Sequence, residues 1–176
     1  MTLLILSDSH GRPDRITEAI RRVKPDGILF AGDGLRDLAS CELPASAESC
    51  PLWAVKGNCD WLVSPLVIRN ALWEVSDEEL ICVDGIRILL THGNKYSVKG
   101  GLGQAIARAV SQAADVLVFG HTHTPIELHL SPEHTYDIAV TKPLTVFNPG
   151  SVGDSNPSFG TLTIRNGQLL FGHGEL

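Results

Sequence analysis

The chain has 176 residues, of which 43% are hydrophobic and 19% are charged. A chain of this length can bury a core of its own as a single domain over residues 1–176, and its composition excludes intrinsic disorder. Fourteen Lys and Arg against 20 Asp and Glu give a net charge of −6, which argues against a surface that binds extended nucleic acid or an anionic membrane.

Hydrophobic segments are too short to cross a membrane. No apolar run approaches the roughly 18 residues that a membrane-spanning helix needs, and the first residues lack the basic start of a signal peptide. We therefore expect a cytoplasmic protein, in which thiols are reduced. The four cysteines are Cys41, Cys50, Cys59 and Cys82, and no pair of them has the C-x2-C spacing of a structural zinc site.

The first third of the chain has the pattern of a parallel sheet. Apolar runs at residues 3–7, 28–31 and 52–55 predict buried strands, and apolar residues three and four apart predict a helix over residues 14–23. Alternating strands and helices favour parallel pairing, with ligands at the carboxyl ends of the strands. Residues 40–51 are interpreted as a surface loop.

Antiparallel structure is predicted for much of the rest. Asp84-Gly85 is a strong hairpin signal between strands at residues 79–83 and 86–91. A helix is predicted over residues 102–113, followed by a buried strand over 116–119. Further strands are predicted at residues 126–130, 144–147, 160–164 and 169–172, the last two joined by a turn at Asn166-Gly167. The sequence therefore predicts an α/β fold with two mixed β-sheets.

Metal-binding side chains follow the ends of five predicted strands. These candidates are Asp8, His10, Asp33, Asn58, His92, His121 and His123. Each alone has a structural interpretation, because an Asn can form a turn and a His can be hydrogen-bonded at a strand end. Their recurrence at equivalent positions favours one metal site instead.

The order of these motifs resembles that of the calcineurin-like metallophosphoesterase superfamily. The motifs are Asp8-Ser9-His10, Gly32-Asp33, Gly57-Asn58-Cys59-Asp60, His92-Gly93 and Gly120-His121-Thr122-His123. The short length, the GNCD form and the late Asn148-Pro149-Gly150-Ser151 resemble the small YfcE-type phosphodiesterase branch. The resemblance implies two mixed β-sheets packed as a sandwich flanked by helices.

The resemblance also implies two divalent metal ions. Asp8, His10, Asp33 and His123 would bind the first ion, and Asp33, Asn58, His92 and His121 would bind the second, so that Asp33 bridges them. Nitrogen and oxygen ligands without thiolate suit manganese, which we expect first, with zinc, iron or nickel as alternatives.

The implied reaction is attack of a metal-bridging hydroxide on phosphorus, in line with the leaving alkoxide. Asp33, Asn58, Cys59 and Asp60 form the expected catalytic group, with Asp60 behind the ligands. Many relatives have a histidine where this chain has Cys59, and that histidine is thought to protonate the leaving group. The Cys59 thiol could donate a proton or could merely line the pocket.

Three functions are compatible with this resemblance. A phosphodiesterase acting on a small or nucleotide-like substrate is favoured. A phosphomonoesterase is the closer alternative, since charge does not separate the two. A non-catalytic protein-interaction scaffold, like the small retromer subunit of this fold, is disfavoured because all seven ligand positions are filled. Exposed hairpin edges and dimeric or tetrameric relatives are consistent with a homo-oligomer.

Several polar residues outside these motifs are interpreted as structural. His129, His134 and His173 are expected at the surface, and so are the charges of Arg12, Lys95 and Lys99. Asn148-Pro149-Gly150-Ser151 is expected to form a rigid turn that closes over the site, because Pro and Gly fix the backbone.

Overall fold

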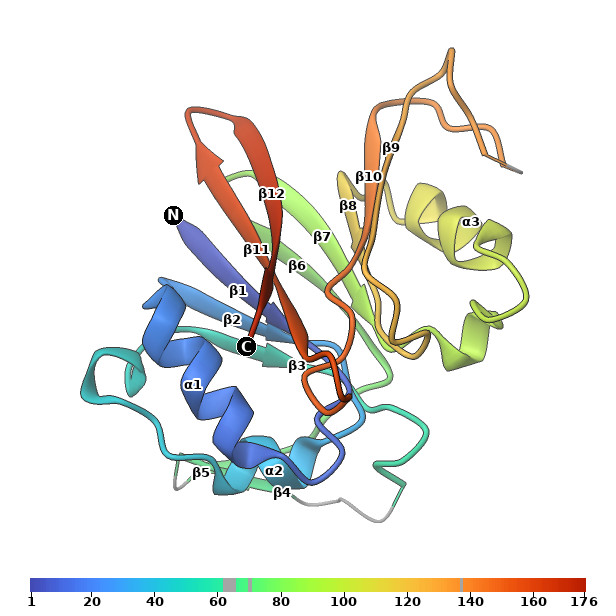
Figure 1. Cartoon of the computed structure of the whole chain (residues 1–176). Helices are drawn as coiled ribbons and strands as arrows, with labels where there is room; N and C mark the ends of the chain where they lie inside the picture. Colours follow the sequence, from blue (N-terminus) through green and yellow to red (C-terminus); the bar gives the residue numbers. More distant parts are fainter. Residues whose placement is uncertain (62–65, 70, 137) are drawn as a thin grey trace.

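Two five-stranded sheets face each other in the computed structural model, which describes residues 1–61, 66–69, 71–136 and 138–176 (Figure 1). The first sheet has the order β12-β11-β1-β2-β3. Its strands are β1 (Thr2–Leu6), β2 (Gly27–Phe30), β3 (Leu52–Ala54), β11 (Ser158–Arg165) and β12 (Gln168–Glu175). β1, β2 and β3 are parallel, and β11 pairs antiparallel with both β1 and β12.

The second sheet has the order β6-β7-β8-β10-β9. Its strands are β6 (Glu78–Val83), β7 (Ile86–Thr91), β8 (Val116–Val118), β9 (Ile126–Leu130) and β10 (Leu144–Asn148). β7, β8 and β10 are parallel, and the outer strands β6 and β9 are antiparallel to their neighbours. A separate small hairpin pairs β4 (Leu66–Ile68) with β5 (Ala71–Trp73).

Helices cover the outer face of each sheet. α1 (Pro13–Val23) and α2 (Leu35–Ser40) lie against the first sheet, and α3 (Gly103–Ser111) lies against the second (Figure 1). Short 3-10 turns occur at Ala45–Ala47 and Asn94–Tyr96. Among the described residues, no helix is long and apolar enough to span a membrane.

Buried residues of β1 alternate between two cores, because successive side chains in a strand point to opposite faces. Leu4 and Leu6 belong to the cluster under α1 and α2, whereas Leu3 and Ile5 belong to the cluster between the two sheets. All four are fully buried. Strands covered on both faces read as continuous apolar runs, which is the pattern that the sequence shows.

The two-sheet sandwich confirms the predicted fold class. The strands and helices inferred from apolar patterns are present, with ends that differ by a few residues. The sequence interpretation missed α2, β4 and β5, which are too short to produce a clear periodicity. Residues 40–51 are also more than a surface loop, because Ala47 and Cys50 pack in the core under α1 and α2.

Candidate metal centre

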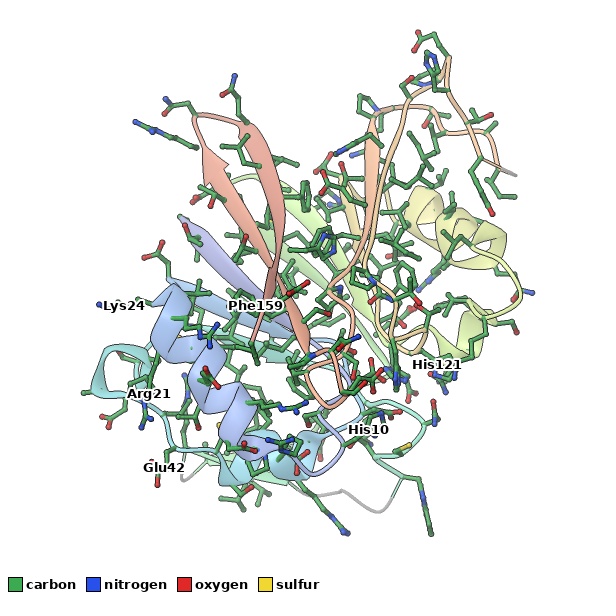
Figure 2. The ribbon with its side chains drawn as sticks, in the orientation of Figure 1. His10, Arg21, Lys24, Glu42, His121 and Phe159 are labelled. Atoms are coloured by element: carbon green, nitrogen blue, oxygen red, sulfur yellow. The ribbon has the colours of Figure 1, made fainter. Side chains whose placement is uncertain are left out.

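Parallel strands bring the predicted ligands to one end of the sandwich. Asp8 follows β1 and Asp33 follows β2, and the two turns are joined by hydrogen bonds from Asp8 N to Gly32 O and from Ser9 N to Asp33 O, each 2.9 Å long. On the second sheet, His92 follows β7, and the Gly120 amide donates to its carbonyl over 3.1 Å. Figure 2 shows His10 and His121 at this same end of the molecule.

The backbone turns sharply at the candidate ligands. Asp8, His10, Asp33, His121 and His123 all have positive φ angles, between 43° and 67°. Residues other than glycine seldom adopt this conformation, and it clusters at functional sites when the surrounding structure enforces it. The turns let the side chains point back across the ends of the strands.

One group of donor atoms is formed by Asp8, His10 and His123. Asp8 Oδ1 lies 3.1 Å from His123 Nε2 and 3.7 Å from His10 Nε2. The two histidine Nε2 atoms are 3.2 Å apart. All three side chains can therefore present one ligand atom to the same point, within 4.8 Å of one another.

A second group is formed by Asp33, His92 and His121, whose ligand atoms also lie within 4.8 Å of one another. His92 Nε2 is 3.3 Å from Asp33 Oδ2 and 3.2 Å from Asn58 Oδ1. Asn58 therefore joins this group through its amide oxygen. His92 Nε2 also lies 4.0 Å from Asp8 Oδ1, so the two groups are adjacent.

Neighbouring acceptors fix the tautomers of two of these histidines. His92 Nδ1 lies 2.8 Å from the Ala31 carbonyl, and His123 Nδ1 lies 3.0 Å from both carboxylate oxygens of Asp154. We assign the ring proton to Nδ1 in each case, because the partner is an acceptor. This leaves the Nε2 lone pairs directed at the site, as in histidines that bind metal.

One carboxylate oxygen of Asp8 receives no hydrogen bond within the described part of the chain, although it lies close to the Nε2 atoms of these histidines. Asp8 is fully buried, and its Oδ1 has no hydrogen-bond partner among the described residues. Its other oxygen accepts from the Ser7 hydroxyl and the His121 amide. Acceptor atoms crowded together in a buried place need a cation or a proton between them. The set of carboxylate, imidazole and amide ligands therefore fits divalent metal ions.

The pKa values of residues at the site are shifted by the same crowding of acceptor atoms. Burial raises the pKa of Asp33, but the imidazolium form of His92 and the hydrogen bond from the Cys59 amide outweigh it and hold that pKa well below its usual range. Burial lowers the pKa of His92, yet the carboxylates of Asp33 and Asp8 raise it overall. Burial, and after it the charges of His92 and Lys99, lower the pKa of His121, which favours its neutral form.

Asp60 organises two of the ligand turns. Its carboxylate accepts four backbone N–H groups, from Asp33 at 2.8 Å, Gly57 at 2.9 Å, and Gly34 and Leu35 at 3.0 Å. The side chain is 3% exposed. Both of its oxygens are engaged with backbone, so we assign Asp60 a positioning role behind the ligands.

Cys59 lies at the exposed edge of the site. Its amide donates to Asp33 Oδ1 over 2.7 Å, and Sγ lies within 4.8 Å of ligand atoms of His10 and Asp33. Partial desolvation, and after it the Asp33 carboxylate, raise the pKa of the thiol to about 11. The structure thus brings the thiol next to the donor set, at the place that the sequence interpretation gave it, either as a proton donor or as a residue that lines the pocket.

The Asn148-Pro149-Gly150-Ser151 turn lies beneath the site. Asn148 Nδ2 donates to Gly120 O at 2.8 Å and to Thr122 Oγ1 at 3.0 Å, and Ser151 Oγ donates to Asp8 O at 2.9 Å. Asn148 and Ser151 are buried. The expectation that this turn closes over the site is therefore wrong, because it joins two ligand loops from within the protein.

Asp154 is a site residue that sequence reasoning missed. It contacts His123 from a loop between β10 and β11, and Arg15 Nη1 fixes that loop by donating to the carbonyls of Val152 and Asp154. Asp154 belongs to none of the five motifs. No pattern in the sequence indicates its contact, because it depends on how two distant loops fold together.

Replacing Asp154 with Ala is expected to weaken metal binding about 10- to 100-fold, because a carboxylate that holds a ligand histidine in place contributes about this much. Calorimetric titration of metal-free protein with manganese measures the effect. Asp14→Ala is the matched control, since Asp14 is an exposed carboxylate paired with Arg12. Equal affinities in the two variants would contradict the role given to Asp154.

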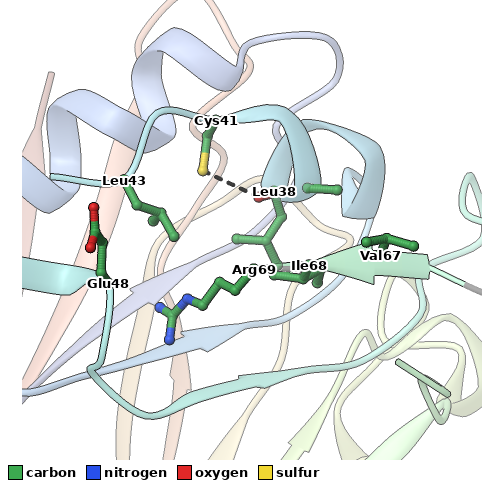
Figure 3. A pocket seen from close by; sticks show the side chains of 8 residues that line it. Leu38, Cys41, Leu43, Glu48, Val67, Ile68 and Arg69 are labelled. Atoms are coloured by element: carbon green, nitrogen blue, oxygen red, sulfur yellow. Dashed lines mark hydrogen bonds between the residues drawn. The ribbon is translucent and has the colours of Figure 1, made fainter. Parts of the chain in front are cut away.

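Several cavities between the described residues border α2. One, of about 190 Å³, adjoins the candidate metal centre and is lined by His10, Asp33 and Cys59 together with Arg36 and Asp37. Another, of about 660 Å³, is lined by residues including Leu38, Cys41, Leu43, Glu48 and Arg69 (Figure 3). The residues that line the 660 Å³ cavity include none of the candidate metal ligands, so chemistry at the candidate metal centre is expected in the 190 Å³ cavity.

The chain is similar to several known proteins. The model of the calcineurin-like phosphoesterase superfamily domain matches residues 1–167. The probable metallophosphoesterase YsnB of Bacillus subtilis is 31% identical over 125 residues, which are 70% of this chain and 64% of YsnB. This chain therefore matches somewhat less than two thirds of that relative's length.

The phosphodiesterase YfcE of Escherichia coli is 28% identical over 183 aligned positions, covering 92% of this chain and 87% of YfcE. Among solved structures, Vps29 of Entamoeba histolytica in complex with zinc superposes with a TM-score of 0.64 at 17% identity, covering 99% of each chain. At that identity the likeness concerns the fold alone.

Proposed function

Because the chain belongs to the calcineurin-like phosphoesterase superfamily, we propose that it is a metal-dependent phosphodiesterase acting on small, nucleotide-like diesters. The observation that carries this proposal is the pair of adjacent donor groups around Asp8 and Asp33, where the buried Asp8 Oδ1 has no hydrogen-bond partner in the described chain. Such a set needs positive charge between its acceptor atoms, and two divalent ions are what the two groups would hold.

Each donor group would hold one metal ion. Asp8, His10 and His123 would bind the first ion, and Asn58, His92 and His121 the second, with Asp33 shared between them. Manganese is the expected metal, and zinc, iron and nickel are the alternatives. When bound, the ions would polarise phosphoryl oxygens and lower the pKa of coordinated water toward about 7.

The chain itself supplies charge balance and rigid placement. Asp8 and Asp33 contribute two negative charges among neutral ligands, which leaves the loaded site positive enough to attract a phosphate anion. Asp60 fixes the turn that carries Asp33, and the Ala31 carbonyl fixes the ring of His92. Preorganised ligands of this kind need no rearrangement when substrate arrives.

The complete donor set argues against a scaffold that has lost catalysis. Vps29 shares the fold, but the proposal of an enzyme depends on the side chains present here and not on the fold. We also predict that the chain forms a single domain, that it is located in the cytoplasm and that it self-associates as a dimer or tetramer.

Metal reconstitution tests the function. Protein stripped of metal is assayed on bis(p-nitrophenyl) phosphate and on p-nitrophenyl phosphate after addition of manganese, zinc, iron or nickel. We expect manganese to restore hydrolysis of the diester and the monoester to be the poorer substrate. Hydrolysis of neither compound with any of the metals would refute the proposal, and faster turnover of the monoester would make the chain a phosphomonoesterase.

Cys59→His is expected to accelerate hydrolysis of alkyl diesters about 10- to 100-fold, because an imidazole of pKa near 6.5 is a better proton donor at neutral pH than a thiol. Aryl diesters, whose phenolate leaves without a proton, should change little. Rates on a methyl and a p-nitrophenyl ester of the same nucleotide measure the difference.

Cys59→Ala is the control for the thiol. If Cys59 lines the pocket, as the position of its side chain at the exposed edge favours, the alanine variant hydrolyses both esters at nearly the original rates. A strong and selective loss on the alkyl ester would instead make the thiol the proton donor. Equal slowing of both esters by histidine would mean that the pocket cannot accept the ring.

A further inference from the structure

We infer that Arg36 forms a subsite for a second phosphate group, next to the phosphate that is hydrolysed. This inference deepens the proposed function and rests on it. It concerns the cavity of about 190 Å³ that is lined by His10, Asp33 and Cys59 and by Arg36 on α2. The lining of this cavity therefore combines candidate metal ligands with an arginine.

The Arg36 guanidinium is available to a ligand. Its side chain is exposed, and within the described part of the chain it enters no ion pair or side-chain hydrogen bond. Several other cations near the ligand loops are occupied: Arg12 pairs with Asp14 at 2.7 Å, Arg15 donates to loop carbonyls, and Lys95 pairs with Asp77. Arg36 therefore differs from these three cations in keeping its donors free.

Two carboxylates in the same cavity are already engaged by the ligand loops. Asp37 Oδ2 accepts from Ser9 Oγ at 2.6 Å and from Gly11 N at 2.7 Å. Asp60 accepts four backbone N–H groups. Neither carboxylate forms an ion pair with Arg36 in the part of the chain that the structure describes, so the guanidinium charge is left for a ligand.

The chemistry of these groups selects a substrate with two phosphates. Guanidinium presents a planar fork of N–H donors that matches the oxygens of a phosphate. A plain diester has one anionic phosphate, which the metal centre would take. A substrate with a second phosphate a few bonds from the first could place that second phosphate against Arg36. A neutral substituent at the same position could not form an ion pair with the guanidinium.

The test compares two esters that differ in one group. The p-nitrophenyl ester of thymidine 5′-monophosphate is assayed with and without a 3′-phosphate, on the manganese-loaded protein. We expect the 3′-phosphorylated ester to have the higher kcat/KM, by about 2- to 5-fold, as is typical for an ion pair at an exposed side chain. Arg36→Gln should bring this ratio close to one, and Arg36→Lys should retain part of it.

Arg12→Gln is the matched control, because Arg12 lies beside the same ligand loop but is paired with Asp14. It should keep the full ratio. A wild-type ratio near one, or a ratio that survives in Arg36→Gln, would overturn the subsite while hydrolysis of the plain ester still supported the proposed function.

Binding measurements separate the two proposals further. Calorimetry compares thymidine 3′,5′-bisphosphate with thymidine 5′-monophosphate on wild type and Arg36→Gln. The subsite requires tighter binding of the bisphosphate by wild type and loss of that preference in the variant. If wild type hydrolyses neither ester, the proposed function fails. The ratio of the affinities for the bisphosphate and the monophosphate, measured by calorimetry, still decides for or against the Arg36 subsite.

Discussion

Replacing Asp33 with Asn should reduce diester hydrolysis about a thousandfold or more and leave the fold intact. Asp33 is the carboxylate shared by the two proposed metal positions, and its removal takes away one of two negative charges that would offset four positive ones. Loss of the corresponding charge stabilisation amounts to several kcal/mol in the transition state. The measurement is kcat/KM on bis(p-nitrophenyl) phosphate with saturating manganese.

The turn should persist in Asp33→Asn, because the amide oxygen of the new side chain can still accept the hydrogen bond that the Cys59 amide gives to Asp33 Oδ1. Thermal unfolding of metal-free protein checks this. Asp115→Asn is the control, because Asp115 is a half-exposed carboxylate paired with Lys142 outside the ligand groups. If the Asp33→Asn variant turns over substrate at nearly the rate of the control, the assignment of Asp33 as the bridging ligand is contradicted.

The clustering of the candidate ligands was predictable because local signals indicate where each one lies. Asp8, Asp33 and His92 each follow an apolar run, and parallel strands place their carboxyl ends at one edge of a sheet. The two groups that the structure brings together contain six of the seven predicted ligands, and Asn58 contacts the second group through His92. Pattern and topology are enough to predict that these candidate side chains lie together.

Contacts between loops could not be predicted from the sequence. Asp154 reaches His123 because Arg15 and the turn after β10 fold its loop back toward the site, and neither interaction has a periodic signal. The sequence analysis placed Asp60 behind the ligands, but its contacts with four amides depend on positive φ at Asp33, which turns these amides toward one carboxylate. Short elements such as α2 escaped prediction for a related reason, since six residues span less than two helical turns.

Asp60→Ala is expected to have the largest effect on stability, about 3–4 kcal/mol in the free energy of unfolding. Four backbone N–H groups, from Asp33, Gly34, Leu35 and Gly57, would lose their acceptor at a buried position. Each unsatisfied buried donor costs about 1–3 kcal/mol, and water that enters the vacated space recovers part of the total. For a domain of this size the melting temperature should fall by about 10 °C.

Urea unfolding of the metal-free protein measures this loss without a contribution from metal binding. Asp60→Asn is the informative partner variant, because its one amide oxygen can replace half of the acceptors, and it should lose less stability than Asp60→Ala. Because Asp60 acts through the turn that carries Asp33, the alanine variant should also bind manganese more weakly than wild type. An alanine variant as stable as wild type would mean that the four amides find other acceptors, and the ligand turn would then owe its shape to the backbone of Asp33 and its neighbouring glycines rather than to Asp60.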